Sequence, residues 1–355
     1  MATVSQVRRH ATPKERALWA EMAQILMLDG LASANNWEAK DIVFHGGTSL
    51  HLGWSSPRHS EDLDFLVKKD LLSEMEKTME KVVDAMRRRI IHLDPDLIVE
   101  IKNKSNPRMG RFNISISKQN VMGKSMVKSE FWGVESTYLD SYNAGRKVPQ
   151  ISSSLQEEGV YVKIRSSLPM ATLDSVYCDK IVAMAGRPHL KWRDAFDLWW
   201  ISQSREFERP EPAVLARRIL HYASAYRNDP NSEDDDSIDR AMSAPPMEVV
   251  DRSVSTFASR LRSYAARVST PEMIEASHTD LKRFLTSISG STKVWDMYWP
   301  AGVHEMVEYA AKTALEMADL IDHVQSQSEK QIQPDVSNVD DEDTPVATGR
   351  NRPTF

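Results

Sequence analysis

The run EDLDFLV, early in the chain, strongly constrains the local fold. Leu63, Phe65 and Val67 occupy every second position, and Asp62 and Asp64 occupy the positions between and before them. Side chains two residues apart share one face of a β-strand. We therefore predict a short strand with one face in a hydrophobic core and two carboxylates on the other face.

The two carboxylates on that face repel each other, because like charges held close together disfavour ionisation. A shared divalent cation relieves this repulsion. Mg²⁺ binds proteins through one or two carboxylates together with substrate phosphates, and two-metal sites stabilise both the attacking and the leaving oxygen. The sequence therefore predicts that Asp62 and Asp64 bind Mg²⁺ (or Mn²⁺).

A glycine turn precedes the acid pair. The stretch IVFHGGTSLHLGW reads as a buried strand, a turn and the start of a helix. Glycines let backbone approach a phosphate closely, and amides at a helix N-terminus favour an anion. Thr48 or Ser49 can add a hydroxyl bond to a phosphate oxygen. Arg58 and Ser60, just before the acid pair, can hold either a triphosphate oxygen or the loop itself.

The order and spacing of these parts are more specific than any one of them. G-G-T-x-L at 46–50, followed by R-x-S-x-D-L-D-F at 58–65, resembles the AbiEii-type nucleotidyltransferase toxins of bacterial toxin–antitoxin and abortive-infection systems. These toxins belong to the DNA polymerase β-like nucleotidyltransferase superfamily. A second block, at 179–198, is similar to the family's downstream pattern of a helical lysine followed by R-D-x-x-D-L. The resemblance covers residues 40–200.

The resemblance implies roles for individual residues. The turn that holds the nucleotide phosphates would be formed by Gly46, Gly47, Thr48 and Ser49. Asp62 and Asp64 would bind the metal, and Lys180 would meet the nucleotide phosphates. Asp194 would be the further catalytic acid, with Asp197 as a second candidate, since residues three apart share a helix face.

Other residues near these motifs keep more than one interpretation. The superfamily often has a third metal-binding carboxylate on a later strand, and Glu100 is the acid inside a strand pattern there. Arg193 either steers phosphate or pairs with an acid. His45, His51 and His59 lie near the motif without thiolates or the spacing of a zinc site, so we predict no zinc site.

The distribution of charge points to an anionic partner. The formal net charge is −6, but residues 228–239 and 331–355 have net charges of −6 and −3, so the rest of the chain has a net charge of +3. Residues 101–128 hold seven Lys or Arg residues and no acid. Such a segment can meet a polyanion such as RNA, or it can be a solvated sheet face balanced by acids elsewhere.

The coarse pattern separates two halves. Strand patterns at LIVEIKN and RFNISIS, with helices at 12–34 and 71–91, precede a region that reads as helical throughout. Thr12, Pro13 and Glu15 predict a capped start for the first helix. This pattern predicts an α/β (α+β) half followed by an all-α C-terminal region. The resemblance implies that the first half is a nucleotidyltransferase core with a mixed sheet.

The predicted boundaries give a nucleotidyltransferase domain at 1–205, a helical domain at 206–330 and a disordered acidic tail at 331–355. Cys178 is the single cysteine, so neither an internal disulfide nor a thiolate zinc cluster can form. There is no signal-peptide pattern and no apolar run of about 18 residues, so we expect a cytoplasmic protein without a membrane span.

The function implied by the resemblance is transfer of a nucleoside monophosphate from an NTP, with release of pyrophosphate. A toxin role implies an antitoxin, and some family members modify the acceptor end of tRNA. The alternatives are a nucleotidyltransferase acting on a protein or a small molecule, and a non-catalytic NTP-binding or partner-binding module on the same fold. Metal-dependent NTP turnover separates an enzyme from a binding module.

Overall fold

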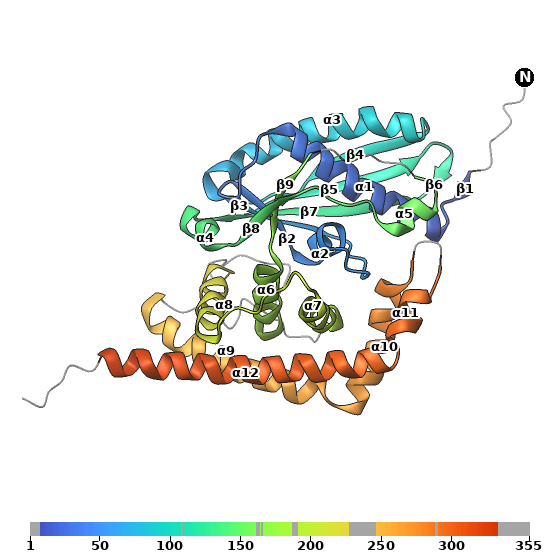
Figure 1. Cartoon of the computed structure of the whole chain (residues 1–355). Helices are drawn as coiled ribbons and strands as arrows, with labels where there is room; N and C mark the ends of the chain where they lie inside the picture. The colour runs from blue at the N-terminus through green and yellow to red at the C-terminus, as the bar shows by residue number, and fades with distance from the viewer. Residues whose placement is uncertain are drawn as a thin grey trace, which may run out of the picture.

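The structure, a computed structural model of the 355-residue chain, describes residues 8–107, 109–160, 164, 166–186, 191–226, 246–287 and 290–332. The acidic run 228–239 lies outside the described residues. The predicted disordered tail, 331–355, also lies outside them from residue 333 on, whereas Gln331 and Ile332 end α12. Figure 1 shows one large β-sheet with helices on both sides and a long helix, α12 (Ala301–Ile332), along the bottom of the view.

Seven strands form the large sheet, in the order β4 (Leu97–Asn103), β5 (Met109–Lys118), β7 (Lys124–Val134), β3 (Leu63–Lys68), β2 (Ile42–His45), β9 (Leu168–Ala171) and β8 (Ala144–Lys147). β3 is parallel to β7 and β2 is parallel to β9, whereas the other neighbouring pairs are antiparallel. A separate short pair joins β1 (Arg9–His10) to β6 (Val121–Met122). The predicted fold class, a mixed sheet followed by helices, is confirmed.

Strand β3 has the predicted alternation. Leu63, Phe65 and Val67 are fully buried, and Asp64 lies on the opposite face. The Phe65 ring stacks on Phe131 of β7, with 4.7 Å between the ring centroids. Apolar packing on one face therefore fixes the direction in which the acid side chain points.

Helices α1 (Pro13–Ala34) and α3 (Met75–Leu93) cover one face of the sheet, at the top of Figure 1. Their buried side chains share a core with β3, β5 and β7. α1 begins with the predicted capping box: the Glu15 amide donates to the Thr12 hydroxyl at 3.1 Å, and the Thr12 amide donates to the Glu15 carboxylate at 2.8 Å. This cap satisfies backbone donors that the first turn of a helix leaves unpaired.

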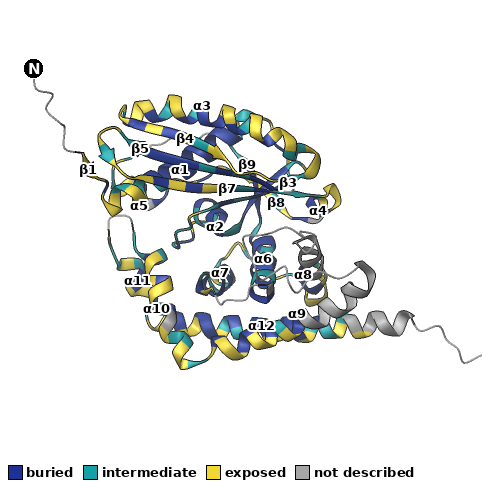
Figure 2. Cartoon of the chain, turned by 180° about the vertical axis from the view of Figure 1, so that it is seen from behind, coloured by how far each residue is buried: buried dark blue, intermediate teal, exposed yellow. Residues whose placement is uncertain are grey.

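The other side of the sheet carries the remaining long helices. In chain order these are α2 (Gly46–Trp54), α6 (Leu173–Gly186), α7 (Trp192–Gln203), α8 (Pro212–Tyr226), α9 (Pro246–Val268), α10 (Pro271–Leu285), α11 (Lys293–Tyr298) and α12. Shorter turns are η1 (Lys69–Glu74), α4 (Ser136–Ser141) and α5 (Ser153–Glu157). The buried sides of α6, α7 and α12 face one another, and exposed residues lie on the outside of α12 (Figure 2).

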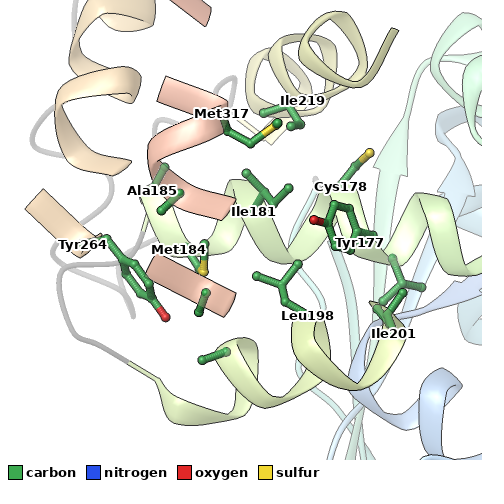
Figure 3. Close-up of a cluster of buried hydrophobic side chains, with 14 of the residues drawn as sticks. Tyr177, Cys178, Ile181, Met184, Ala185, Leu198, Ile201, Ile219, Tyr264 and Met317 are labelled. Carbon is green, nitrogen blue, oxygen red and sulfur yellow. The ribbon is translucent and has the colours of Figure 1, made fainter. Parts of the chain in front are cut away.

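A single hydrophobic core joins helices before and after the predicted boundary at residue 205. Ile181 and Leu198 come before it, Ile219 and Met317 come after it, and all four lie in the cluster of Figure 3. The division at residue 205 stays a prediction. Cys178 is buried in the same cluster, and burial raises the pKa of its thiol, which disfavours the reactive thiolate. No helix in the described parts of the chain has the length and apolar character to cross a membrane.

Candidate active site

Three carboxylates meet on the face of the sheet opposite α1 and α3. Asp64 on β3 is the register partner of Glu130 on the parallel strand β7, and Asp62 immediately precedes β3. Neighbouring strands lie about 4.8 Å apart, so side chains in register on one face lie side by side. The predicted acid pair is therefore part of an acid cluster formed by Asp62, Asp64 and Glu130.

Electrostatics in the acid cluster disfavour negative charge. Burial raises the pKa of Asp62, and the charge of Asp64 raises it further. The pKa of Glu130 is raised by burial and then by the charges of Asp64 and Asp62. The charge of Lys128 lowers the pKa values of both Asp62 and Glu130. Arg111, whose Nε lies 3.0 Å from the Glu130 carboxylate, lowers the pKa of Glu130. A hard divalent cation fits this set of oxygen donors.

Sequence reasoning missed Glu130. Glu100, the candidate from the strand pattern, is exposed on β4, three strands away from β3 in the sheet. The structure therefore brings Glu130, and not Glu100, to Asp64. Buried positions in β7 are occupied by Ser125 and Ser129, which interrupt the apolar alternation that marks a strand. Glu130 could have been predicted from the sequence as an acid that lies within an alternation of small and apolar residues.

The glycine turn packs tightly against the acid cluster. Gly46 has a φ of +79°, and a Cβ placed there would lie 2.7 Å from Oδ2 of Asp64. A Cβ at Gly47 would collide with the Arg58 guanidinium and lie 3.0 Å from the Ser60 hydroxyl. Both glycines are therefore required by close approach, and Gly46 also by its left-handed backbone.

The two hydroxyls of the turn bond to backbone. The Thr48 hydroxyl donates to the Asp62 carbonyl oxygen, and the Ser49 hydroxyl donates to the Gly46 carbonyl oxygen at 2.8 Å. Both side chains are buried. The Thr48 bond ties the first turn of α2 to Asp62, just before β3, whereas the Ser49 bond closes the turn itself.

Residues of the second sequence block join Arg58 of the first block in a buried ionic network, formed by Arg58, Lys180, Asp194 and Asp197. Arg58 donates from Nε and Nη2 to the two carboxylate oxygens of Asp197, at 2.7 Å each. Lys180 Nζ lies 2.7 Å from Asp197 and 3.1 Å from Asp194. Exposure ranges from 0% for Asp197 to 8% for Lys180. Of the two roles open for Arg58, this geometry supports holding the loop.

Helix α10, from the C-terminal region, borders the acid cluster. The Arg193 guanidinium lies 4.7 Å from the centroid of the Phe284 ring, and its charge lowers the pKa of Asp62. The His59 amide donates to the Phe284 carbonyl oxygen at 2.9 Å. The sequence predicted that α10 is helical but not where it packs. The contact between His59 and Phe284 joins segments more than two hundred residues apart in the chain.

His45, which directly precedes the glycine turn, has polar partners. His45 is buried on β2 as the register partner of Asp64, and its Nδ1 lies 3.2 Å from Oδ2 of Asp179. The Tyr142 hydroxyl donates to the same oxygen at 2.5 Å. Nε2 of His45 is buried without a hydrogen-bond partner.

The sequence model of the nucleotidyl transferase AbiEii toxin family, from type IV toxin–antitoxin systems, matches residues 31–296. The chain belongs to the AbiEii nucleotidyltransferase toxin family. Among solved structures it is similar to JHP933 from Helicobacter pylori, with 16% identity, a TM-score of 0.44 and 90% of this chain and 99% of that chain covered. A protein from H. pylori assigned as a nucleotidyltransferase has the same identity and coverage and a TM-score of 0.41. No curated protein sequence matches.

The AbiEii match confirms the resemblance drawn from the motifs and the prediction of an enzyme. It spans the glycine turn, the acid cluster and the ionic network. An AbiEii nucleotidyltransferase uses an NTP and typically a divalent metal, and a type IV toxin implies an antitoxin partner. The donor set of the acid cluster fits the metal, and the glycine turn fits an anionic group at a helix N-terminus.

Proposed function

We propose that this AbiEii toxin is a Mg²⁺-dependent enzyme that transfers a nucleoside monophosphate from an NTP to an RNA acceptor such as tRNA. The acceptor oxygen bonds to the α-phosphorus, and the bond from that phosphorus to the leaving pyrophosphate breaks. The observation that carries the choice of RNA is a set of basic side chains on the same sheet face as the acid cluster.

The acid cluster and the turn form the NTP site in this proposal. Asp62, Asp64 and Glu130 hold Mg²⁺ (or Mn²⁺), which when bound neutralises charge on the transferring phosphoryl group. The amides at the start of α2 meet the triphosphate, because unpaired amides and the helix dipole favour an anion there. Ser60 packs over Gly47 and keeps the loop before β3 on the turn.

The ionic network divides into two parts in this proposal. Lys180 and Asp194 retain slight exposure, and Lys180 is the cation that meets the nucleotide phosphates while Asp194 is the further catalytic acid. Asp197 is fully buried between both cations, so it positions Arg58 and Lys180 and does not touch substrate. This assignment separates the two aspartates that spacing alone left ambiguous.

The acceptor surface is a basic face formed by Lys102, Lys104, Lys124 and Lys128. Lys102 and Lys128 are both register partners of Asn113, so they lie on one face, and all four lysines are exposed. Lys128 lies two residues before Glu130 in β7 and therefore on the same side of that strand, which supports an acceptor surface that begins beside the acid cluster. Phosphate contacts of this kind supply most non-specific affinity for nucleic acid.

Labelling with α-³²P NTPs tests the transfer. Purified protein is incubated with Mg²⁺, each labelled NTP in turn and total bacterial RNA, beside an Asp64→Ala control. We expect a labelled band of tRNA size that is lost in the control. Label on protein or on a small molecule, with none on RNA, would overturn the RNA acceptor and favour the alternative nucleotidyltransferases. Absence of any transfer by folded protein would overturn the NTP site.

Charge reversal tests the acceptor surface. Lys102→Glu with Lys124→Glu is expected to weaken RNA binding and lower its salt dependence by about one to two counterions, because each phosphate contact releases close to one. NTP binding should be unchanged. The matched control is Lys77→Glu with Lys81→Glu, which reverses two exposed charges on α3 at the other face of the sheet. Equal RNA binding by both double variants would remove the basic face from the proposal.

A further inference from the structure

Outside the acid cluster, three more side chains of metal-binding type converge. They are Glu21 from α1, His51 from α2 and His59 from the loop before β3, and their ligand atoms all lie within 4.8 Å of one another. Oε1 of Glu21 lies 3.3 Å from Nε2 of His51 and 3.4 Å from Nδ1 of His59. Glu21 is 4% exposed, and its Oε2 is buried without a hydrogen-bond partner.

The hydrogen bonds of His51 fix which ring nitrogen carries a proton. Nδ1 lies 2.7 Å from the Ser56 carbonyl oxygen, which can only accept, so Nδ1 is the donor. In the neutral ring, Nε2 is then a lone pair directed at the Glu21 carboxylate. Two electron-pair donors at this distance repel unless a cation lies between them.

Glu21 is a buried carboxylate whose charge needs such a cation. Its Oε1 faces both imidazoles, at 3.3 Å from Nε2 of His51 and 3.4 Å from Nδ1 of His59. A buried carboxylate that is ionised at neutral pH requires a positive partner. The partner is either a proton on the imidazoles or one metal ion shared by all three side chains.

The separations fit a metal ion. A tetrahedral site with bonds of about 2.0–2.1 Å to nitrogen and oxygen places neighbouring ligand atoms about 3.3–3.4 Å apart, which matches both Glu21–histidine distances. We propose that Glu21, His51 and His59 bind a divalent transition-metal ion of the zinc class, at a site separate from the acid cluster. Two imidazoles with one carboxylate select such an ion over Mg²⁺.

The surroundings support the same site. The bond from His51 to the Ser56 carbonyl is the outer-shell contact that metal-binding histidines usually make. The His59 side chain is 24% exposed, which gives water access as a fourth ligand. Glu21 lies thirty residues before His51, so the spacing of the histidines alone could not reveal the site.

The bound ion would lock the segment that leads into the acid strand. Three residues after Glu21, the Gln24 side chain already donates to the Ser60 and Glu61 carbonyl oxygens, at 2.8 and 3.0 Å. Coordination of His59 adds a second link between α1 and the same loop. Because this loop carries Arg58 and ends at Asp62, the metal of the zinc class holds the scaffold of the active site and does not touch the NTP.

Metal titration of the full chain tests the site. Chelator-treated protein carrying Asp62→Asn and Asp64→Asn, which removes the acid cluster as a competing site, is titrated with Zn²⁺ by calorimetry. We expect one ion per chain and a rise in Tm. Adding His59→Asn should weaken Zn²⁺ binding by more than about a hundredfold, because changing an outer-shell partner alone costs about 10–100-fold. His92→Asn, at an exposed histidine of α3, is the matched control and should bind as before.

A second measurement keeps the test decisive if His59→Asn does not fold. Co²⁺ added to the chelator-treated protein without other substitutions should give the visible absorption of a tetrahedral site, and Zn²⁺ should displace it. Absence of stoichiometric Zn²⁺ binding would overturn the metal site and leave protonated imidazoles as the partners of Glu21. Binding that survives both His59→Asn and Glu21→Gln would overturn the assignment of these ligands.

Discussion

Two groups of charged side chains meet at the glycine turn and are built in opposite ways. In the acid cluster, like charges lie side by side, and the pKa values of Asp62 and Glu130 are raised by burial and by neighbouring carboxylates. In the ionic network, each of the two cations lies within 3.1 Å of an acid. Two cations balance two acids in the network, whereas Asp62 and Glu130 of the acid cluster keep raised pKa values although Arg111 and Lys128 lie near them.

This difference separates what the fold requires from what the chemistry requires. A buried ion pair stabilises only when its partners stay together, because one partner alone leaves an uncompensated charge. A group of carboxylates with raised pKa values opposes folding at neutral pH. Its presence at a strand end is therefore explained by its function in binding a cation. Arg58 of the ionic network packs over Gly47, and Asp64 of the acid cluster packs over Gly46. The network therefore helps to position the turn that contacts the acid cluster.

Asp64→Asn gives the largest expected effect and tests the acid cluster directly. Nucleotidyl transfer should fall by at least about a thousandfold, the upper end for loss of one pre-organised charge-stabilising group. The free energy of unfolding should stay equal or rise at pH 7. A carboxyl group whose pKa is raised in the folded state makes the folded protein less stable as pH increases. Removal of the Asp64 charge reduces this loss of stability at Asp62 and Glu130.

Label incorporation and urea denaturation of the same Asp64→Asn preparation measure the two quantities. Asp70→Asn, an exposed acid in η1, is the matched control and should change neither. A variant that loses activity together with several kcal/mol of stability would show that Asp64 serves the fold, and the contrast between the two groups would fail.

Asp197→Asn tests the other side of the comparison. It leaves Arg58 and Lys180 buried with one carboxylate fewer, and breaking a buried pair in this way costs about 3–5 kcal/mol. Urea denaturation measures the loss. Asp194→Asn, at the other end of the network, should cost less stability and reduce nucleotidyl transfer at a temperature where the variant is folded. Equal destabilisation by both would contradict the division of roles within the network.

The sequence predicted the parts of the site that are local in the chain. The alternation around Asp64, the glycine turn before α2 and the capping box at Thr12 each depend on residues within a few positions of one another. Their physical signals, a period of two, a left-handed turn and a cap, are visible in short windows. The mixed sheet was implied by the resemblance and is confirmed.

The parts that stayed hidden depend on strand order or on distant segments. Glu130 joins the acid cluster because β7 lies next to β3, and the serines of β7 mask that strand in the sequence. Glu21 meets His51 and His59 across a helix packing that no spacing rule encodes. Asp179 reaches His45 from α6. Each is a non-local contact, which a single sequence does not specify.

Glu130→Gln sharpens the comparison, because it tests whether the third acid belongs to the cluster by function as well as by place. We expect nucleotidyl transfer to fall by about 10–100-fold, at least the effect of losing an outer-shell partner of a metal ligand. Mg²⁺ titration of the activity should show a higher requirement. Glu100→Gln is the matched control on the exposed strand β4 and should retain full activity. The reverse result would restore Glu100 as the third carboxylate.

Asp174→Asn gives the smallest expected effect and extends the contrast to a single carboxylate. Burial raises the pKa of Asp174, but hydrogen bonds from Thr172, Arg218 and Asn143 outweigh burial and hold it below its ordinary value. A depressed folded pKa contributes stability above the unfolded pKa of about 3.9, and this stability is lost as pH falls through the folded pKa.

The Asp174→Asn variant should therefore be less stable than the parent at pH 7, by about 1–3 kcal/mol for hydrogen bonds to a charged group. The difference should shrink as the pH of the urea denaturation is lowered below 4, where the unfolded chain binds a proton at this position. Glu130→Gln should show the opposite trend, with equal or greater stability than the parent at pH 7, because the raised pKa of Glu130 costs stability as pH rises. If both variants lose stability at pH 7 and regain it in acid, then Glu130 is held as a structural anion like Asp174. A cation supplied from outside would then no longer be needed to explain why three carboxylates lie together.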